Sequence, residues 1–304
     1  MAWYTDDMAN LYSTEVLSGV WQLISADRNA LPAHPALLKV PAPPGSVTVR
    51  VPELDFFGVA LLVSQTNQET DVADTAVTDT ASDIVLSRYS KRHDANSFAQ
   101  ALDANGLINP QQFAIDAMVS YASTIRDMHA NLVDNFATTQ GSTGVDASFA
   151  NFLDCITSLE VAEAVGPILA ILHPVQWADI RKDLALNSGG AIQMNDGSQA
   201  VINAMKGLGA QGSLAGVDVF TTTSVPTANA AADRAGGLFT RGALVHAVSR
   251  PVADPDLPQI VLGSDLLFEK DRDASVANTE YVSHAFMGII EGLDNKGVSL
   301  ITDA

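Results

Sequence analysis

The chain has 304 residues, of which 17% are charged and 47% are hydrophobic, and its formal net charge is −19. Soluble domains carry about 25% charged residues, so this chain is poor in charge and the charge it has is acidic. The acidity excludes a basic nucleic-acid-binding face, the hydrophobic content excludes disorder, and the single Cys155 excludes a disulfide-stapled module. Low charge suits subunits that cover one another, although composition alone favours an ordinary enzyme.

The N-terminus lacks the basic start and apolar run of a signal peptide. The longest apolar stretch, residues 165–178, is shorter than a membrane-spanning helix and contains two prolines, Pro167 and Pro174. We therefore expect no membrane segment and synthesis in a cytoplasm, with Cys155 buried as a small hydrophobic residue.

Residues 1–45 are predicted to form an extended arm, because prolines between residues 32 and 44 prevent regular helix. Residues 46–92 are predicted to form a two-limbed β excursion, in which Val49 and its neighbours alternate with polar residues. Between its limbs, Val51 to Ser87 holds seven acidic residues and no basic one, with Arg50 and Arg88 on either side. This segment is either a solvated hairpin or a loop that reaches a neighbouring subunit.

A long amphipathic helix is predicted over residues 109–137. Asn109 can cap it, Pro110 suits its first position, and Gln112 stands where a capping box places Glu or Gln. At about 1.5 Å per residue this helix is roughly 40 Å long. Its apolar face consists of Met118, Tyr121, Ile125, Met128, Leu132 and Phe136.

The rest of the chain alternates between helix and strand, which indicates mixed α and β structure. A capping box at Thr157 to Glu160 predicts the start of a helix, and Asp271 to Asp273 predict a turn or loop. The other expected elements are buried strand 168–172, a helix from His173 with Trp177, Ile180 and Leu184 on one face, and strands at 217–222, 244–248, 266–270, 280–290 and 298–301.

No motif in the sequence predicts catalysis, a cofactor or a metal. Residues 207–212 match the letters of a dinucleotide-binding fingerprint, but a helical stretch precedes them where the motif requires a strand. The six histidines do not stand at metal-ligand spacing, and the paired aspartates at 254 and 256 and at 271 and 273 lack a calcium-loop pattern. Groups distant in sequence could still meet in space, so an enzyme stays open at this point.

The order of the parts resembles the major capsid protein of tailed double-stranded DNA bacteriophages, the Hong Kong 97-type fold. Residues 168–174, followed by Trp177 to Arg181, look like the strand, His-Pro and helix of the axial domain. Residues 212–226, ending in Ser224-Val225-Pro226, look like another stretch of that domain. Glu269 to Asp273 stand where the family often has a charged loop.

The resemblance implies an α+β fold with an N-terminal arm, an extended β loop, a peripheral domain with a long spine helix, and an axial α/β domain. It places the arm at 1–45 and the extended loop at 46–92. The peripheral domain would then be 93–140 and 251–292, with the spine helix at about 109–137, and the axial domain would be 141–250 and 293–304.

The implied function is a viral structural protein without catalytic, cofactor-binding or metal-binding residues. It would self-assemble through hexamers and pentamers into the icosahedral capsid of a bacteriophage virion, in the host bacterial cytoplasm. Implied partners are a separate scaffolding protein, a portal protein at one vertex and a possible decoration protein. The shell would enclose DNA without sequence-specific binding.

Some relatives crosslink their subunits through a lysine in the extended loop. This chain has no lysine between Lys39 and Lys91, so we expect a non-covalent shell without isopeptide bonds. The candidates for contacts between subunits are Arg50, Arg88, Arg250, Glu269, Asp271, Arg272 and Asp273.

Two other functions remain open from the sequence. An encapsulin-like compartment shares the fold, although such proteins usually have a helical start and a shorter excursion. A soluble α/β enzyme with an unrecognised site is the less favoured alternative.

Overall fold

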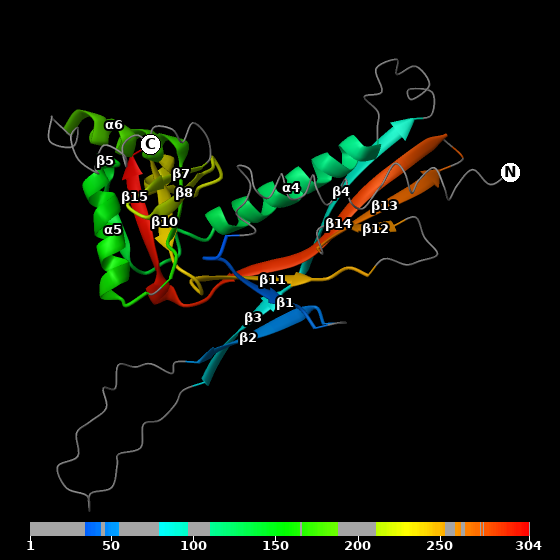
Figure 1. Ribbon diagram of the computed structural model, residues 1–304, viewed down its shortest axis with the longest axis horizontal. Helices are drawn as coiled ribbons and strands as arrows, with labels where there is room; N and C mark the ends of the chain where they lie inside the picture. The colour runs from blue at the N-terminus through cyan, green and yellow to red at the C-terminus, as the bar shows by residue number, and fades with distance from the viewer. Residues whose placement is uncertain are drawn as a thin grey trace, which may run out of the picture.

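The computed structural model describes residues 34–43, 46–54, 79–96, 110–164, 166–187, 211–252, 259–262, 265–273, 275 and 277–303. The tip of the predicted excursion and the glycine motif at 207–210 lie outside these residues. In the described chain, two β-sheets lie end to end and make an elongated molecule (Figure 1).

The first sheet is built around one long strand, β14 (Asn278–Glu291), which is shared by neighbours on both sides. Helix α4 (Pro110–Ala130) lies along one face of this sheet (Figure 1) and buries Met118 and Ile125 against it. The other strands are β1 (Leu38–Pro41), β11 (Leu244–Ser249), β13 (Leu266–Asp273), β12 (Gln259–Leu262) and β4 (Ser87–Asn96). Strand β11, expected in the axial part, therefore lies in this sheet.

The second sheet has a buried centre, as the hydrophobic sequence of β6 (Leu169–Leu172) predicts. Helices α5 (Phe149–Val161) and α6 (Pro174–Asn187) cover one face of it with Phe152 and Trp177. The other strands are β5 (Thr139–Asp146), β15 (Gly297–Asp303), β10 (Asp233–Phe239), β8 (Val217–Thr221), β7 (Gln211–Leu214) and β9 (Thr227–Ala228). Two short 3₁₀ helices, η3 (Asn229–Ala231) and η4 (Asp294–Lys296), lie in the connections.

A two-stranded ribbon, β2 (Thr48–Leu54) and β3 (Asp79–Val85), packs on the first sheet at β11 and the end of β14 (Figure 1). Val49 and Ile84 are its buried contacts, facing Val245 and Ala247 of β11. Gly288 of β14 allows this approach, because a Cβ atom there would collide with the carbonyl oxygen of Val85. The two limbs predicted for the excursion are thus antiparallel strands.

Helix α4 ends at Ala130, seven residues before the predicted end at 137. The apolar spacing continues through Leu132 and Phe136, but there the chain turns between the two sheets, and Val133 and Phe136 are buried. The Ser299 hydroxyl donates to the Val133 carbonyl at 2.6 Å and fixes this turn. We call residues 129–136, together with the buried side chains that pack around them, the joint. Packing between the sheets overrides the local helical pattern there.

The predicted capping box at Thr157 lies inside a helix instead of at its start. The N-cap of α5 is Ser148, whose hydroxyl accepts from the Asn151 amide at 3.2 Å. Thr157 and Ser158 donate their hydroxyls to carbonyls four residues earlier, at 3.0 and 2.8 Å. A Ser or Thr hydroxyl can either cap a helix start or bond to a carbonyl one turn earlier within a helix. The capping-box pattern does not distinguish these two roles, so it misplaced the start of α5.

The start of α6 matches its prediction and adds a buried anchor. The amide of His173 donates to Oε1 of Gln176 at 3.0 Å, which is the reciprocal half of a capping box. Nε2 of the fully buried Gln176 donates to the carbonyls of Arg234 and Leu300 and to the Thr302 hydroxyl, at 3.0, 3.2 and 2.8 Å. One side chain thus joins α6 to β10 and β15.

The described part of the arm lies on both sheets. Strand β1 pairs in parallel with β11, and His34 Nε2 lies 3.0 Å from a carboxylate oxygen of Asp218 in β8. Lys39 forms an ion pair with Asp265, which also accepts a hydrogen bond from the Tyr121 hydroxyl at 3.2 Å. Residues 34–41 therefore cross the joint.

Candidate assembly surfaces

Asp271, Arg272 and Asp273 form the end of strand β13, where the sequence predicts a turn or loop. They pair in register with Glu280, Thr279 and Asn278 of β14. The pattern misled because charged residues usually mark a loop, whereas here the neighbouring strand continues beyond the hydrophobic core. The charged end of β13 is therefore part of the sheet, and its register with β14 fixes the position of each charged residue.

Pairing fixes which face of the sheet each charge occupies. Residues directly opposite one another on neighbouring strands share a face, and successive residues alternate. Asp271 lies opposite Glu280, and Glu280 lies opposite Asp94 of β4. These three carboxylates form one row across the sheet, which we call the acidic row. Arg272 lies on the other face, the one that α4 covers.

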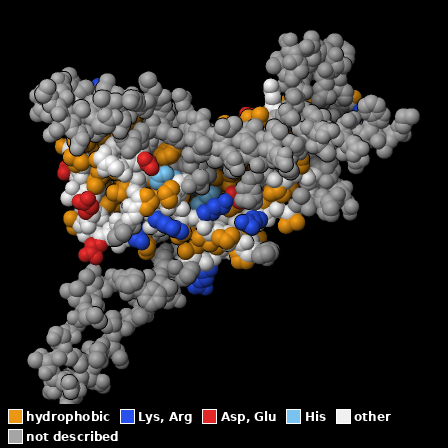
Figure 2. All heavy atoms as spheres, in the orientation of Figure 1, with side chains coloured by type: hydrophobic (Ala, Val, Ile, Leu, Met, Phe, Trp, Pro, Cys, Tyr) orange, Lys and Arg blue, Asp and Glu red, His pale blue; other side chains and the backbone are white. Residues whose placement is uncertain are grey.

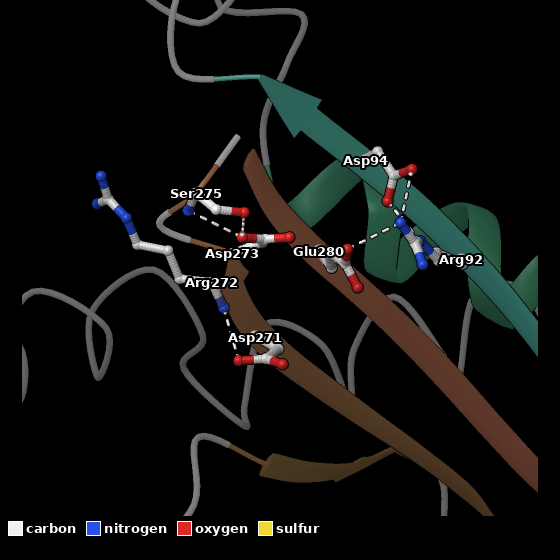
Figure 3. A network of polar contacts seen from close by, with 7 residues as sticks. All are labelled: Arg92, Asp94, Asp271, Arg272, Asp273, Ser275 and Glu280. Atoms are coloured by element: carbon white, nitrogen blue, oxygen red, sulfur yellow. Dashed lines mark hydrogen bonds and ion pairs between the residues drawn. The ribbon is translucent and has the colours of Figure 1, made fainter. Parts of the chain in front are cut away.

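One arginine neutralises part of the acidic row (Figure 3). Arg92 contacts Asp94 at 2.6 Å and Glu280 at 2.8 Å. The hydrogen bond from Arg92 lowers the pKa of Asp94, and the same hydrogen bond raises the pKa of Arg92. Because Arg92 and Asp94 are exposed, water and salt screen this network, and it contributes little to folding.

The other charged residues at the end of β13 differ in the hydrogen bonds and ion pairs that they make. The Asp271 carboxylate accepts from the backbone amide of Arg272 at 2.7 Å, and Asp273 accepts from the amide of Ser275 at 2.9 Å. The Arg272 side chain extends away from these residues (Figure 3) and makes no ion pair with another described residue.

Glu269 is engaged within the sheet. It accepts from the Gln259 amide nitrogen at 2.8 Å and lies 3.6 Å from Nε2 of His284. Lys270 stands on the opposite face, 6.0 Å from the centre of the Tyr281 ring, and burial lowers its pKa. Of the four charged candidates on β13, Glu269 is the least available for a contact between molecules.

The three arginine candidates lie apart from the acidic row, and two of them, Arg50 and Arg88, are near the base of the ribbon. Arg50 is opposite Asp83 in the ribbon, and Arg88 is opposite Phe286 at the start of β4. Arg250 follows β11 directly. All three are exposed, and none makes an ion pair with a described residue. The predicted set is therefore spread over both faces and both ends of the first sheet and does not form one surface.

Sequence reasoning missed Arg92, Asp94 and Glu280 as members of the charged network. The excursion was predicted to end at residue 92, whereas β4 continues to Asn96. The alternation of Arg92 and Asp94 with His93 and Ala95 was the available signal, since Ala95 is buried and the charged residues are exposed.

The buried polar groups of the described chain serve the fold. The Nδ1 atom of His129 bonds to the Ile125 carbonyl at 2.7 Å, and its ring packs edge to face on His246 of β11, with ring centres 5.6 Å apart. Burial lowers the pKa of His129 to about 4 and that of His246 to about 3. Burial also raises the pKa of the Cys155 thiol to about 12, so that it stays protonated and unreactive.

The described residues contain no cluster of three or more metal-ligating side chains. They also contain no helix that is both long and apolar enough to cross a membrane. A cavity of about 120 Å³ lies between α4 and the strands beneath it. Its polar lining is already engaged, because Lys91 donates to the Ser120 hydroxyl at 2.7 Å and pairs with Asp116.

No family model matches the sequence, and no curated protein matches it. Solved structures do match. The capsid of Ralstonia phage GP4 is 10% identical with a TM-score of 0.62, covering 92% of this chain and 88% of that one. A structure from Mycobacterium phage Che8 is 16% identical with a TM-score of 0.54, covering 84% of both chains. The SrpI encapsulin from Synechococcus elongatus is 14% identical with a TM-score of 0.54, covering 91% of this chain and 88% of that one.

These matches define the class of structure. The chain has the α+β Hong Kong 97-type fold, shared by phage capsid subunits and by an encapsulin. The fold expected from the sequence is confirmed.

Proposed function

We propose that this protein is the major capsid protein of a tailed double-stranded DNA bacteriophage, and that its copies self-assemble into the icosahedral shell around the genome. The observation that carries the proposal is a match over most of the chain to structures that include several phage capsids. The role is structural and not catalytic. The shell belongs to the virion and assembles in the host bacterial cytoplasm.

The six-stranded sheet with α4 would be the peripheral domain, with α4 as its spine helix, and the seven-stranded sheet with α5 and α6 would be the axial domain. Pairing supports assigning β11 to the peripheral domain. Residues 1–45 would be the arm and 46–92 the extended loop. Axial domains would then gather at the centre of hexamers and pentamers.

The other partners follow from this role. A separate scaffolding protein would guide assembly, a portal protein would occupy one vertex, and a decoration protein could bind outside. The net charge of −19 supports a wall that confines DNA without binding it by counterion release.

Expression of the chain, with and without a scaffolding protein, followed by electron microscopy tests the proposal. Closed shells tens of nanometres across are expected, whereas a species below about 150 kDa would contradict it.

An encapsulin-like compartment is the second candidate, favoured by the match to the SrpI encapsulin. The two candidates differ in cargo. Particles purified from infected cells would carry double-stranded DNA if the protein is a capsid subunit, and an enclosed protein if it is a compartment.

We also propose that Arg272 contacts the acidic row, around Asp271, of a neighbouring subunit. The exposed side chain of Arg272 and its lack of an ion pair with another described residue support this contact. Arg272→Glu should reduce shell yield at least several-fold while subunit folding, followed by circular dichroism, is unchanged. Arg241→Glu, at another exposed arginine, is the matched control. Wild-type yield from Arg272→Glu would overturn the contact.

The shell is proposed to be non-covalent, because no lysine stands between Lys39 and Lys91. Mature particles should run as single subunits on denaturing gels. Covalent ladders of subunits would contradict this proposal.

A further inference from the structure

The described part of the arm is fastened at two places that differ in their surroundings. At its start, His34 Nε2 lies 3.0 Å from a carboxylate oxygen of Asp218 in the second sheet. Further along, β1 pairs in parallel with β11 of the first sheet, and Lys39 forms an ion pair with Asp265. The arm therefore ties the two sheets together, with one fastening on each.

The fastening on the first sheet is small. Strand β1 has four residues and lies at the edge of this sheet (Figure 1), where β11 is its partner among the described strands. Leu38 and Val40 are only partly buried. Short edge elements with few buried contacts open at a lower free energy than the whole molecule. Strand β1 is therefore the part of the first sheet that can detach while the rest stays folded.

Two buried imidazoles lie beneath this fastening. Lys39 and His246 are register partners, so their side chains share the face of the sheet that α4 covers. His246 packs edge to face on His129, near the end of α4, with ring centres 5.6 Å apart. The Nε2 atoms of both histidines are buried and have no hydrogen-bond partner within the described chain. Neither atom therefore has an acceptor that would stabilise an added proton.

The charged groups that face His246 oppose its protonation. Within the described chain they are Lys39 from β1, which is cationic, and His129 from α4, which becomes cationic in acid. Asp265, the buried acid near this face, is already engaged by Lys39 and by the Tyr121 hydroxyl. An imidazolium at His246 would therefore meet positive neighbours in a dry interior.

Strand β14, on the other side of β11, brings one acid to the same face. This residue, Glu291, stands two positions beyond the partner of His246 and is hydrogen-bonded to Asp294 instead of to a histidine. Burial, His129 and Lys39 lower the pKa of His246 to about 3, and burial lowers the pKa of His129 to about 4. Both imidazoles are therefore neutral at pH 7 while the arm is docked.

We propose that this arrangement is an acid-sensitive fastening, in which mild acid releases β1 from the first sheet while His34 keeps the arm on the second sheet. Release lets water reach the imidazoles and separates Lys39 from His246. A solvated histidine takes up a proton near pH 6.5. Because the released state binds the extra protons, each pH unit below this value favours release by up to about tenfold per histidine. The docked arm is favoured above pH 6.5 and is weakened as the pH falls.

The fastening on the second sheet responds to acid in the opposite sense. His34 lies against the Asp218 carboxylate, so a proton on His34 adds an attraction instead of a repulsion. Asp218 is largely exposed, and water screens this attraction. Mild acid therefore weakens one fastening of the arm and leaves the other in place.

Hydrogen exchange of the full chain, measured by mass spectrometry at pH 7, 6 and 5, tests the release. The reporter is the peptide that contains Ala42, whose amide donates to the Val248 carbonyl at 2.8 Å in the docked arm. After correction for the intrinsic effect of pH on exchange, opening of this peptide should rise at least tenfold between pH 7 and pH 5. Strand β10 of the second sheet is the internal reference and should not change. No rise in the arm, or equal rises in the arm and β10, would overturn the inference.

Histidine variants identify the trigger. His246→Gln removes one titrating group and should reduce the rise at least threefold. His284→Asn removes a histidine from the opposite face of the same sheet and should keep the wild-type rise. A wild-type rise in His246→Gln would overturn the role of the buried pair. All these measurements use unassembled subunits, so their outcome does not depend on the proposed function.

A disulfide provides a readout that leaves the histidines unchanged. Val40 and Ala247 are register partners in β1 and β11, and neighbouring positions in a sheet are within the reach of a disulfide. In Val40→Cys with Ala247→Cys, oxidation should abolish the rise in exchange at pH 5, and reduction should restore it in the same protein. Cys155 does not compete, because burial raises the pKa of its thiol to about 12. A wild-type rise in the oxidised protein would overturn the release of β1.

Discussion

The joint and the outer end of the first sheet both contain ionisable side chains, but those in the joint are buried and those at the outer end are exposed to solvent. In the joint, His129 and His246 are buried, and their environment favours the neutral imidazoles. At the outer end, Arg92 and Asp94 are exposed and the environment favours their charged forms. Burial makes a polar residue part of the fold, because any change in its charge must be accommodated in a dry interior. Exposure leaves a charge free to meet another molecule.

The largest expected effect comes from opening a cavity in the joint. Phe239 is fully buried there, against Phe136 and Ile171. Phe239→Ala should lower the free energy of unfolding of unassembled subunits by about 3–5 kcal/mol, measured by urea denaturation. Val161→Ala, at the 80% exposed last residue of α5, is the control truncation and should change the free energy of unfolding by less than about 0.5 kcal/mol. Equal losses in both variants would show that the joint is not a distinct core.

The second effect is a loss of stability in acid that originates in the joint. An unfolded histidine takes up a proton near pH 6.5, whereas burial delays this to about pH 4 for His129 and about pH 3 for His246. A protonated His129 and Lys39 also oppose protonation of His246. Because the unfolded chain binds more protons, stability is complete above pH 6.5 and falls as the pH drops toward these folded-state values. The loss between pH 7 and pH 5 is on the order of 2 kcal/mol for each histidine.

Urea denaturation at pH 7, 6 and 5 measures this loss. His246→Leu removes one titrating imidazole, and we expect its stability to fall less steeply with acid than that of the wild type. His284→Asn, which removes a histidine of β14 that points away from the joint, should keep the wild-type slope. An unchanged slope in His246→Leu would contradict the role of the buried pair.

The sequence predicts the joint and the outer end unequally well. Local sequence identified α4 from its apolar stripe, β6 from a short apolar run and the start of α6 from His173-Pro174, because each signal lies within the element itself. Local sequence failed where contacts with distant segments of the same chain decide the backbone conformation. The turn after Ala130 follows from packing between two sheets, and the extended conformation of Asp271 to Asp273 follows from pairing with β14.

The candidate contact residues show the same division. Composition around Asp271 and Arg272 indicated a charged surface, and alternation along a strand would have separated their faces if the segment had been recognised as a strand. The row formed with Glu280 and Asp94 depends on the register of three strands. Register depends on pairing between distant segments, so one sequence does not show it.

The smallest expected effect on the fold is at the outer end, and there the comparison becomes sharpest. Arg92→Ala breaks the contacts with Asp94 and Glu280, yet the unfolding midpoint of unassembled subunits should stay unchanged, because water already solvates exposed charges in the folded state. The same change leaves three carboxylates of the acidic row without a counter-charge, so repulsion among them should make the row a stronger acceptor for a cationic side chain. If Arg272 of a neighbour is that side chain, shell assembly of Arg92→Ala should tolerate more salt than that of the wild type, measured as particle yield against sodium chloride concentration. A lower unfolding midpoint in Arg92→Ala would instead assign the network to the fold, as in the joint.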